Sequence, residues 1–267
     1  MPLYYLLVLA LVQGITEFLP ISSSGHLILM PDLLGEADQG VGVDVAVHVG
    51  TLLAVVLYFW ADVKRIFWGA GDIARGRSTT QNAKLTSMLI LATMPVLAAG
   101  LAIKITGLSD EMRNIEVIGW TMIVFGVILY GMDKLCPAQR TADSWGLKDA
   151  LIMGVWQAIA LIPGTSRSGA TITGARMLGF TRHDGTKLAM LMSIPTIMAS
   201  GLLLTGEVVA LADWRLARDA AIGAGFAFVA ALMSLSVMMR FLDRVSYTPY
   251  VIYRVLLGLV LLWIAYT

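Results

Sequence analysis

The chain has 267 residues, of which 58% are hydrophobic and only 14% are charged. Because an ordinary soluble domain has about 25% charged residues, this composition predicts an integral membrane protein. The formal net charge of +1 gives no basic surface for nucleic acid, so we expect no nucleic-acid partner. Cys136 is the single cysteine, which excludes an internal disulfide and a cysteine-based metal site.

The first apolar stretch, residues 3–34, is predicted to be a broken hairpin rather than one straight helix. It lacks the basic segment of a cleaved signal peptide, so we expect it to remain in the mature fold. Pro20, a run of serines and Gly25 interrupt it. Arms at 3–19 and 24–34 would each be shorter than a membrane core of about 30 Å. Irregular backbone at membrane depth must be buried in protein or line a wet cavity, so this hairpin should be re-entrant and line a site.

Three continuous apolar segments follow, each long enough to span a membrane, and the same order then repeats. The predicted spans of the first half are 43–60, 85–103 and 115–132. A polar stretch at 133–148 precedes a second broken hairpin at 149–180 and spans at 187–206, 219–239 and 250–266. The predicted fold is an all-α polytopic membrane protein with six transmembrane helices and two re-entrant helix hairpins.

The two halves are predicted to form an inverted-topology internal repeat. Matching residues lie 144 positions apart: Gln13, Ile15, Ser22, Ser24, Gly25 and Ile28 pair with Gln157, Ile159, Ser166, Ser168, Gly169 and Ile172. Since each half has three spans, the halves would have opposite orientations, as in transporters with paired broken helices. We expect residues 1–133 and 134–267 to be the repeats of one integrated membrane domain.

The distribution of basic residues predicts the orientation. Lys and Arg are concentrated in the loops expected at 61–84, 134–148, 180–187 and 240–249. The positive-inside rule makes these loops cytoplasmic and puts both termini outside. The first hairpin would then enter from the outer face and the second from the inner face, so that their tips can meet.

Candidate chemistry at the first hairpin begins with Gln13 and Glu17, which share one helix face at i,i+4 spacing. A glutamate in a membrane segment is costly and by default marks a site, although it could instead only satisfy the broken hairpin. Ser22–Ser24 could bind substrate or simply cap the break. His26 is a candidate general acid or base. His48 in the next span is a weaker candidate that could serve only to line the cavity.

The second hairpin contains a polar, glycine-punctuated turn, Pro163–Thr171, which predicts an anion pocket. Ser166 and Ser168 are good N-cap residues, and the first free N–H groups of the following helix would lie beside Arg167. Arginine grips phosphate oxygens bidentately, whereas a purely structural Arg167 would need a buried partner such as Glu17. The phosphate-binding candidates in this turn are Gly164, Thr165, Ser166, Arg167, Ser168, Gly169 and Thr171.

Together the two motifs resemble one known family. They read Gln13-x-x-x-Glu17, continuing as Phe18-Leu19-Pro20-Ile21-Ser22-Ser23-Ser24-Gly25-His26, and Pro163-Gly164-Thr165-Ser166-Arg167-Ser168-Gly169-Ala170-Thr171. This pattern resembles the undecaprenyl-diphosphate phosphatase, or bacitracin-resistance, family. The resemblance implies a multi-pass enzyme of the bacterial plasma membrane that removes the terminal phosphate of undecaprenyl diphosphate. It would regenerate the carrier for cell-wall precursors in a site open to the outer side, with a divalent cation, Mg²⁺ or Ca²⁺.

The resemblance also implies roles for individual residues. The catalytic set would be Glu17, Ser23, His26 and Arg167, with Gln13, Ser22, Ser24 and Gly25 completing the substrate site of the first tip. Glu17, with Gln13 as a second contact, would anchor the cation or orient the nucleophile, and substrate oxygens and water would complete the ligands. His26 would transfer the proton. Ser23 would be either a covalent nucleophile or a phosphate ligand.

Two further expectations concern partners and an alternative function. The polyprenyl tail of the substrate would lie in a groove between spans, in contact with membrane lipid, and a homodimer is one possible assembly. Because inverted repeats with paired broken helices are also transporter architecture, a polyprenyl-phosphate flippase is the rival function.

Overall fold

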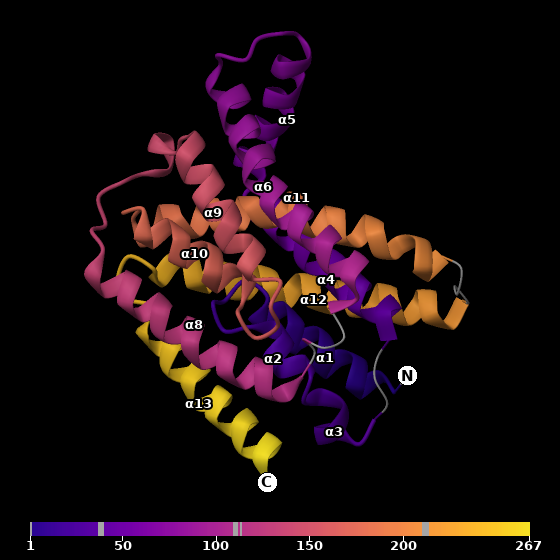
Figure 1. Cartoon of the computed structure of the whole chain (residues 1–267). Helices are drawn as coiled ribbons and strands as arrows, with labels where there is room; N and C mark the ends of the chain where they lie inside the picture. Colours follow the sequence, from indigo (N-terminus) through magenta and orange to yellow (C-terminus); the bar gives the residue numbers. More distant parts are fainter. Residues whose placement is uncertain (1, 37–39, 109–111, 113, 210–213) are drawn as a thin grey trace.

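The computed structural model describes residues 2–36, 40–108, 112, 114–209 and 214–267. All of the secondary-structure elements in this part of the chain are helices, apart from one isolated β-bridge, which confirms the all-α class (Figure 1). Long helices lie at the predicted spans: α4 (Gly40–Tyr58), α6 (Gln81–Thr106), α8 (Ile115–Leu135), α11 (Arg182–Val209), α12 (Trp214–Phe241) and α13 (Thr248–Tyr266).

Four of these helices, α6, α8, α12 over Ala217–Phe241 and α13, are long and apolar enough to cross a membrane. A bent pair, α4 with α5 (Trp60–Ala74), adds a fifth candidate if it counts as one span. The described part of the chain therefore has the helices of a polytopic membrane protein, and the number of six spans stays a prediction.

The first hairpin differs from the prediction in its second arm. Its first arm is α1 (Leu3–Thr16), which ends three residues before the predicted 19. The second arm, predicted as one helix at 24–34, is two short helices, α2 (Ser23–Leu27) and α3 (Met30–Leu34). Pro31 lies in the first turn of α3, where its missing N–H costs nothing, and so it starts a new helix instead of continuing α2.

The second hairpin consists of α9 (Leu147–Ile159) and α10 (Arg167–Met177) on either side of the polar turn. Ser166 is the N-cap of α10, as predicted, and its Oγ accepts a hydrogen bond of 3.1 Å from the Gly169 N–H. Arg167 is the first residue of α10, as Ser23 is of α2. Both tips thus place a functional candidate at the start of a helix.

The stretch at 61–84, expected as a loop, contains α5, which follows α4 at an angle of 90°. Gly69 lets α5 approach α6 closely, because a Cβ at this position would lie 2.2 Å from both the Asn82 carbonyl oxygen and the Thr86 Oγ1. The α5 helix and the start of α6 project beyond the other helices (Figure 1). The basic residues of this region therefore belong to a helical hairpin, not to an irregular loop.

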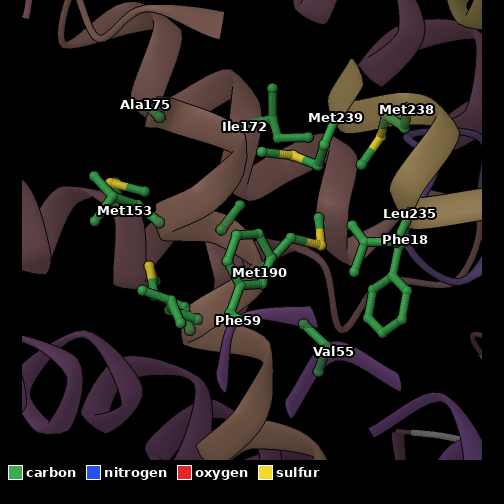
Figure 2. Packing of buried hydrophobic residues seen from close by; sticks show 14 of the residues in the cluster. Phe18, Val55, Phe59, Met153, Ile172, Ala175, Met190, Leu235, Met238 and Met239 are labelled. Carbon is green, nitrogen blue, oxygen red and sulfur yellow. The ribbon is translucent and has the colours of Figure 1, made fainter. Parts of the chain in front are cut away.

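The largest buried cluster joins both hairpins to the long helices. It includes Phe18 after α1, Val55 in α4, Met153 in α9, Ile172 in α10 and Leu235 in α12, and Figure 2 shows these side chains converging on the methionines of α11 and α12. Phe18 is only 1% exposed. Because Phe18 is packed in this way, its neighbour Glu17 is held in a fixed place at the first break.

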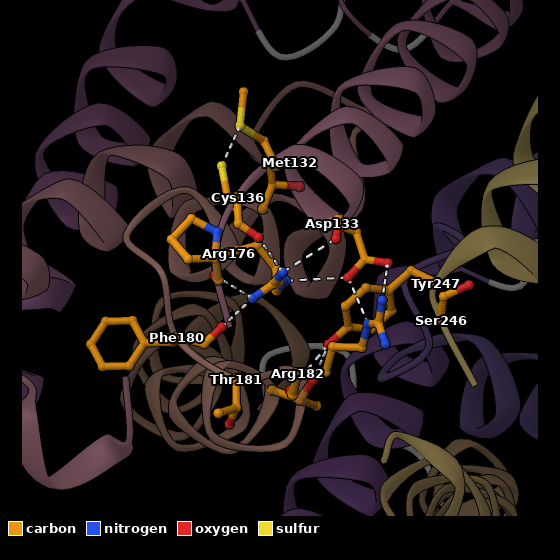
Figure 3. Close-up of polar contacts among 12 residues, drawn as sticks. Met132, Asp133, Cys136, Arg176, Phe180, Thr181, Arg182, Ser246 and Tyr247 are labelled. Carbon is orange, nitrogen blue, oxygen red and sulfur yellow. Dashed lines mark hydrogen bonds and ion pairs between the residues drawn. The ribbon is translucent and has the colours of Figure 1, made fainter. Parts of the chain in front are cut away.

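A buried ionic cluster holds the far end of α10 (Figure 3). Asp133 of α8 accepts hydrogen bonds from Arg182 Nε at 2.7 Å and from Arg176 Nε at 3.2 Å. Arg176 is 1% exposed and also donates to the main-chain carbonyls of Asp133, Cys136, Pro137 and Phe180. With its donors satisfied in this way, Arg176 ties α10 to the end of α8 and to the start of α11.

The two breaks share one local geometry. Ser22 and Ser166 have φ of 72° and 70°, and among the described residues they are the non-glycine positions with positive φ. The Ser22 Oγ lies 3.0 Å from the Ser24 Oγ, and the Ser166 Oγ lies 3.1 Å from the Ser168 Oγ. A β-carbon in this backbone region is strained, so both serines must be held there by the surrounding contacts.

Candidate functional site

The two hairpin tips meet, as the sequence predicted. The Gly164 N–H donates to the Ser24 Oγ at 3.1 Å, and the Ser168 Oγ donates to the Leu19 carbonyl oxygen at 2.9 Å. Each tip therefore satisfies a polar group of the other, and the residues at their junction form one site.

Glu17 is the centre of this junction. It is 8% exposed, and its Oε1 accepts a hydrogen bond from the Arg167 guanidinium. Its Oε2 accepts from the Ser23 Oγ at 3.0 Å and from the Gln13 Nε2 at 2.8 Å. The internal ion pair that we considered as a structural role for Arg167 is thus formed, and an incoming phosphate would have to share Arg167 with Glu17.

A third element, α4, also contributes to the site. The His48 Nδ1 lies 2.7 Å from the Asp44 carbonyl oxygen, and the His48 Nε2 lies 3.2 Å from the Gln13 Nε2. A carbonyl can only accept, so Nδ1 carries the proton, and in the neutral ring Nε2 has a free lone pair that accepts from the Gln13 amide. Gln13 consequently donates both of its amide hydrogens, one to Glu17 and one to His48.

These groups open onto a cavity of about 450 Å³. Its lining includes polar side chains from both hairpins and from α4 and α11: Glu17, Ser22, Ser23, Ser24, Asp44, His48, Gln157, Ser166, Arg167, Thr196 and Ser200. A second cavity of about 800 Å³ shares Ser23, Ser24, Asp44 and His48 and has mostly apolar walls. A charged group with an apolar tail would find complementary surfaces here.

The second tip is held rigidly behind Arg167. Gly164 has φ of +85°, and a Cβ there would lie 2.1 Å from the Thr121 Oγ1. Thr121 also donates to the Pro163 carbonyl oxygen at 2.6 Å. Only glycine fits this turn, so Gly164 shapes the pocket through its backbone.

Some predicted residues face away from the cavities. The His26 Nδ1 donates to the Ser22 carbonyl oxygen at 2.7 Å, its Nε2 accepts from the Tyr253 hydroxyl at 2.6 Å, and it lines neither of the two cavities described above. Gly25 packs against Met122, where a Cβ would lie 2.6 Å from the sulfur. These placements show structural contacts for His26 and Gly25, and their predicted roles stay predictions.

The remaining candidates of the second tip are buried. The Thr171 Oγ1 donates to the Arg167 carbonyl oxygen at 2.9 Å, and Ser168 and Gly169 contact Leu19 and Ser166 as described above. Thr165 is fully buried, and its Oγ1 has no hydrogen-bond partner. Among the candidates of this tip, Ser166 and Arg167 are therefore the side chains that line the cavity of about 450 Å³.

The sequence interpretation missed Arg254 of α13. It is fully buried, and its guanidinium donates to the carbonyl oxygens of Met122, Pro20, Gly164 and Thr165. Pro20 belongs to the first tip, and Gly164 and Thr165 belong to the second, so one side chain joins both tips to α8. An arginine inside an apolar span marks a site by default, and this signal was present in the sequence.

The residues present do not fit a resident divalent cation. No group of three His, Cys, Asp or Glu side chains among the described residues could hold a metal ion. Both oxygens of Glu17 already accept from protein donors, which leaves the buried, unpaired Oε1 of Gln13 as a single neutral oxygen beside them. Glu17 with Gln13 is therefore an ion-paired and hydrogen-bonded unit.

Fold and site together define a class, a helical membrane protein with a buried charged site between two broken helices. The family model described as bacitracin resistance protein BacA matches residues 6–260, and the chain belongs to this family. The resemblance drawn from the motifs is confirmed.

Relatives named undecaprenyl-diphosphatase match the chain over its length. The protein of Dinoroseobacter shibae is 61% identical over 267 residues, and that of Ruegeria pomeroyi is 60% identical, each with 100% of both chains covered. The protein of Maricaulis maris is 44% identical, with 98% of both chains covered. The similarity therefore includes both tips and all of the long helices.

Proposed function

We propose that the protein is an undecaprenyl-diphosphate phosphatase, which hydrolyses undecaprenyl diphosphate to undecaprenyl phosphate and inorganic phosphate. This reaction recycles the lipid carrier for cell-wall synthesis. The observation that carries the proposal is the convergence of Glu17, Ser23 and Arg167 from two broken helices on one cavity. The name shared by the full-length relatives supports the choice of substrate.

Binding of the diphosphate depends on Arg167 and on the start of α10. The guanidinium neutralises phosphate charge, and the free N–H groups and dipole of the helix N-terminus favour an anion. Substrate binding draws Arg167 partly away from Glu17, so that the carboxylate becomes available to the attacking group. The ion pair thus keeps both charges compensated until the phosphate arrives.

The hydroxyl beside Glu17 takes part in the attack on the terminal phosphorus. The Ser23 Oγ already donates its hydrogen to the Glu17 Oε2, at 3.0 Å. Ser23 is either the nucleophile, activated by Glu17, or a phosphate ligand beside an attacking water. His26 stays the predicted proton carrier, and in this arrangement it would act through the Tyr253 hydroxyl.

The divalent cation, Mg²⁺ or Ca²⁺, stays a proposal from the family resemblance. Because Glu17 is already satisfied by protein donors, we place the cation with the substrate, whose diphosphate oxygens are the hard ligands that these ions prefer. Its proposed protein contact is Glu17, with Gln13 beside it, once substrate binding has drawn Arg167 away from the Glu17 Oε1.

We further propose the full topology of six spans and two re-entrant hairpins related by an inverted repeat of residues 1–133 and 134–267. The shared φ values of Ser22 and Ser166 and their matching Oγ contacts support this. The protein would lie in the bacterial plasma membrane with both termini outside and the site open to the outer face. A homodimer remains a prediction.

The test is phosphate release from undecaprenyl diphosphate by the purified protein in detergent. Glu17→Ala and Arg167→Ala should each lower release at least about 100-fold, because each removes a charge used at the reacting phosphate. Asp143→Ala, at an exposed position, is the matched control. Full activity in either site variant, with the protein folded, would disprove the site.

The rival flippase is distinguished by the same preparation. No phosphate release from the wild-type protein with Mg²⁺ or Ca²⁺ present, together with transfer of undecaprenyl phosphate across liposomes, would favour transport. The nucleophile is settled by acid quench during turnover: phosphate covalently trapped on Ser23 indicates a serine nucleophile, and its absence indicates water.

A further inference from the structure

We propose that His48 of α4 is a catalytic residue of this site, whose Nε2 accepts a hydrogen bond from the hydroxyl group that attacks the terminal phosphorus. The inference rests on the proposed function and adds a third element to the two hairpin tips. It applies directly to an attacking water, and to Ser23 once its hydroxyl hydrogen turns from the Glu17 Oε2 to the His48 Nε2.

The first argument for this role is the orientation of the His48 ring. Nδ1 donates to the Asp44 carbonyl oxygen at 2.7 Å, a contact within α4 that fixes both the ring and its tautomer. Nε2 is therefore the accepting nitrogen, and it points toward Gln13 at 3.2 Å and toward the Glu17 Oε2 at 3.8 Å. The basic lone pair of the ring thus faces the polar centre of the site.

The second argument is that the His48 ring is exposed to the cavities. The His48 side chain is 38% exposed, whereas that of Glu17 is 6% exposed. His48 lines both cavities, together with Ser23. In this structure the His48 Nε2 accepts one hydrogen bond, from the Gln13 amide, and a hydroxyl in the cavity of about 450 Å³ would take the place of that donor.

The other two histidines lack this arrangement. The ring nitrogens of His26 contact the Ser22 carbonyl and the Tyr253 hydroxyl, and His26 lines neither of the two cavities. His183 is exposed in the first turn of α11, the helix whose first residue, Arg182, binds Asp133. Among the described histidines, His48 is the one that presents a nitrogen to the cavities beside Glu17.

The kinetic test distinguishes direct contact between His48 and the attacking hydroxyl from an indirect role in which His48 only holds Gln13. His48→Ala should lower kcat about 100-fold with little change in KM, the usual effect of losing such a group. His48→Gln, whose amide oxygen can accept the same hydrogen bond, should recover activity to within about 10-fold of the wild type. His183→Gln is the matched control and should be unchanged.

A double-mutant cycle with Gln13→Ala decides whether His48 acts on the attacking hydroxyl directly or through Gln13. If His48 contacts the attacking hydroxyl, His48→Ala still lowers kcat about 100-fold in the Gln13→Ala background. If His48→Ala has no further effect there, His48 acts only by holding Gln13, and the proposal is overturned. Wild-type kcat in the single His48→Ala variant would also overturn it.

A second measurement does not depend on turnover. Protein with isotope-labelled histidine is titrated with inorganic pyrophosphate, and the His48 signal is identified by its loss in His48→Gln. We expect the His48 signal to shift, the His183 signal to stay, and Arg167→Ala to abolish the shift. An unmoved His48 signal at pyrophosphate concentrations that occupy the Arg167 site would contradict the inference.

These outcomes are distinct from failure of the proposed function. That failure would appear as no phosphate release from undecaprenyl diphosphate by the wild-type protein. The pyrophosphate titration would still report whether His48 faces the anion.

Discussion

At the scale of single residues, the site depends on buried polar groups whose partners come from distant parts of the chain. Glu17 and Arg167 are 150 residues apart and form one ion pair. A buried charge without a partner would cost several kcal/mol, so each of these residues offsets the cost of burying the other's charge. The same pair that stabilises the junction also keeps a cation and a carboxylate together where phosphate would bind.

Arg254 provides a residue-scale prediction. Arg254→Met should destabilise the protein by about 3 kcal/mol, because several buried carbonyl oxygens would lose their donor. Thermal unfolding in detergent measures the loss, and phosphate release per folded molecule measures the displacement of the tips. Arg254→Lys should be intermediate in both.

Arg244→Met, at an exposed position, is the control for this substitution. Since Arg254 acts by positioning main-chain carbonyls, its loss should raise KM as well as lower kcat. A stable Arg254→Met variant with unchanged kinetics would show that the tips hold themselves in place.

The sequence predicted much of the site at this scale, but not all of it. Glu17, Ser23, Arg167 and the Ser166 cap could be predicted because they lie in two short motifs whose spacing limits their geometry. His48 was predicted only as a weaker candidate that could line the cavity, which it does, and Arg254 was missed; both come from long helices elsewhere in the chain. Their contribution depends on how α4 and α13 pack against the tips, and helix spacing alone does not define that packing.

At the scale of elements, α10 is held at both ends. Its first residue, Arg167, binds Glu17, and near its other end Arg176 binds Asp133 and several carbonyl oxygens. A helix fixed in this way presents its N-terminal N–H groups in a constant position. The ionic cluster around Asp133 therefore supports the proposed anion pocket from the opposite end of the helix.

Asp133→Ala tests this support. It leaves Arg176 buried without its carboxylate, so we expect a loss of about 3 to 5 kcal/mol in stability. Asp143→Ala, which removes an exposed carboxylate in the connection between α8 and α9, should change stability by less than about 0.5 kcal/mol. Chemical or thermal unfolding in detergent compares the two, and equal stability would contradict the assigned role.

Element boundaries were predicted less well than element types. The helical arms of both hairpins were expected, whereas the division between α2 and α3 and the helix at 60–74 were not. Pro31 was visible in the sequence, but it could equally have ended the arm or started a new helix. The α5 helix depends on close packing of Gly69 against α6, which is a tertiary contact.

At the scale of the whole molecule, the two halves are interlocked. The α1 helix packs against α12, and α9 packs against α6, so the first helix of each hairpin rests on a long helix of the other half. Glycines permit both contacts: a Cβ at Gly14 would lie 2.7 Å from the Ala227 carbonyl oxygen, and a Cβ at Gly154 would lie 2.5 Å from that of Ala92. Neither half would bury its own hairpin alone, which fits one integrated domain.

The proposed orientation can be tested because the chain has a single cysteine. In a Cys136→Ser background, Tyr266→Cys should react with an impermeant maleimide on whole cells, and Ser144→Cys should react only after the cells are broken. Both positions are exposed, so accessibility is not limited by burial. The reverse pattern would put the termini in the cytoplasm.

The position of Arg254 in the chain has a consequence for biosynthesis. This residue lies in α13, the last helix described, yet it donates to carbonyl groups of both tips. During synthesis, the first hairpin is made long before that donor leaves the ribosome. The tips must therefore wait with their carbonyl groups unpaired or hydrated, and the junction between them is completed only when α13 inserts.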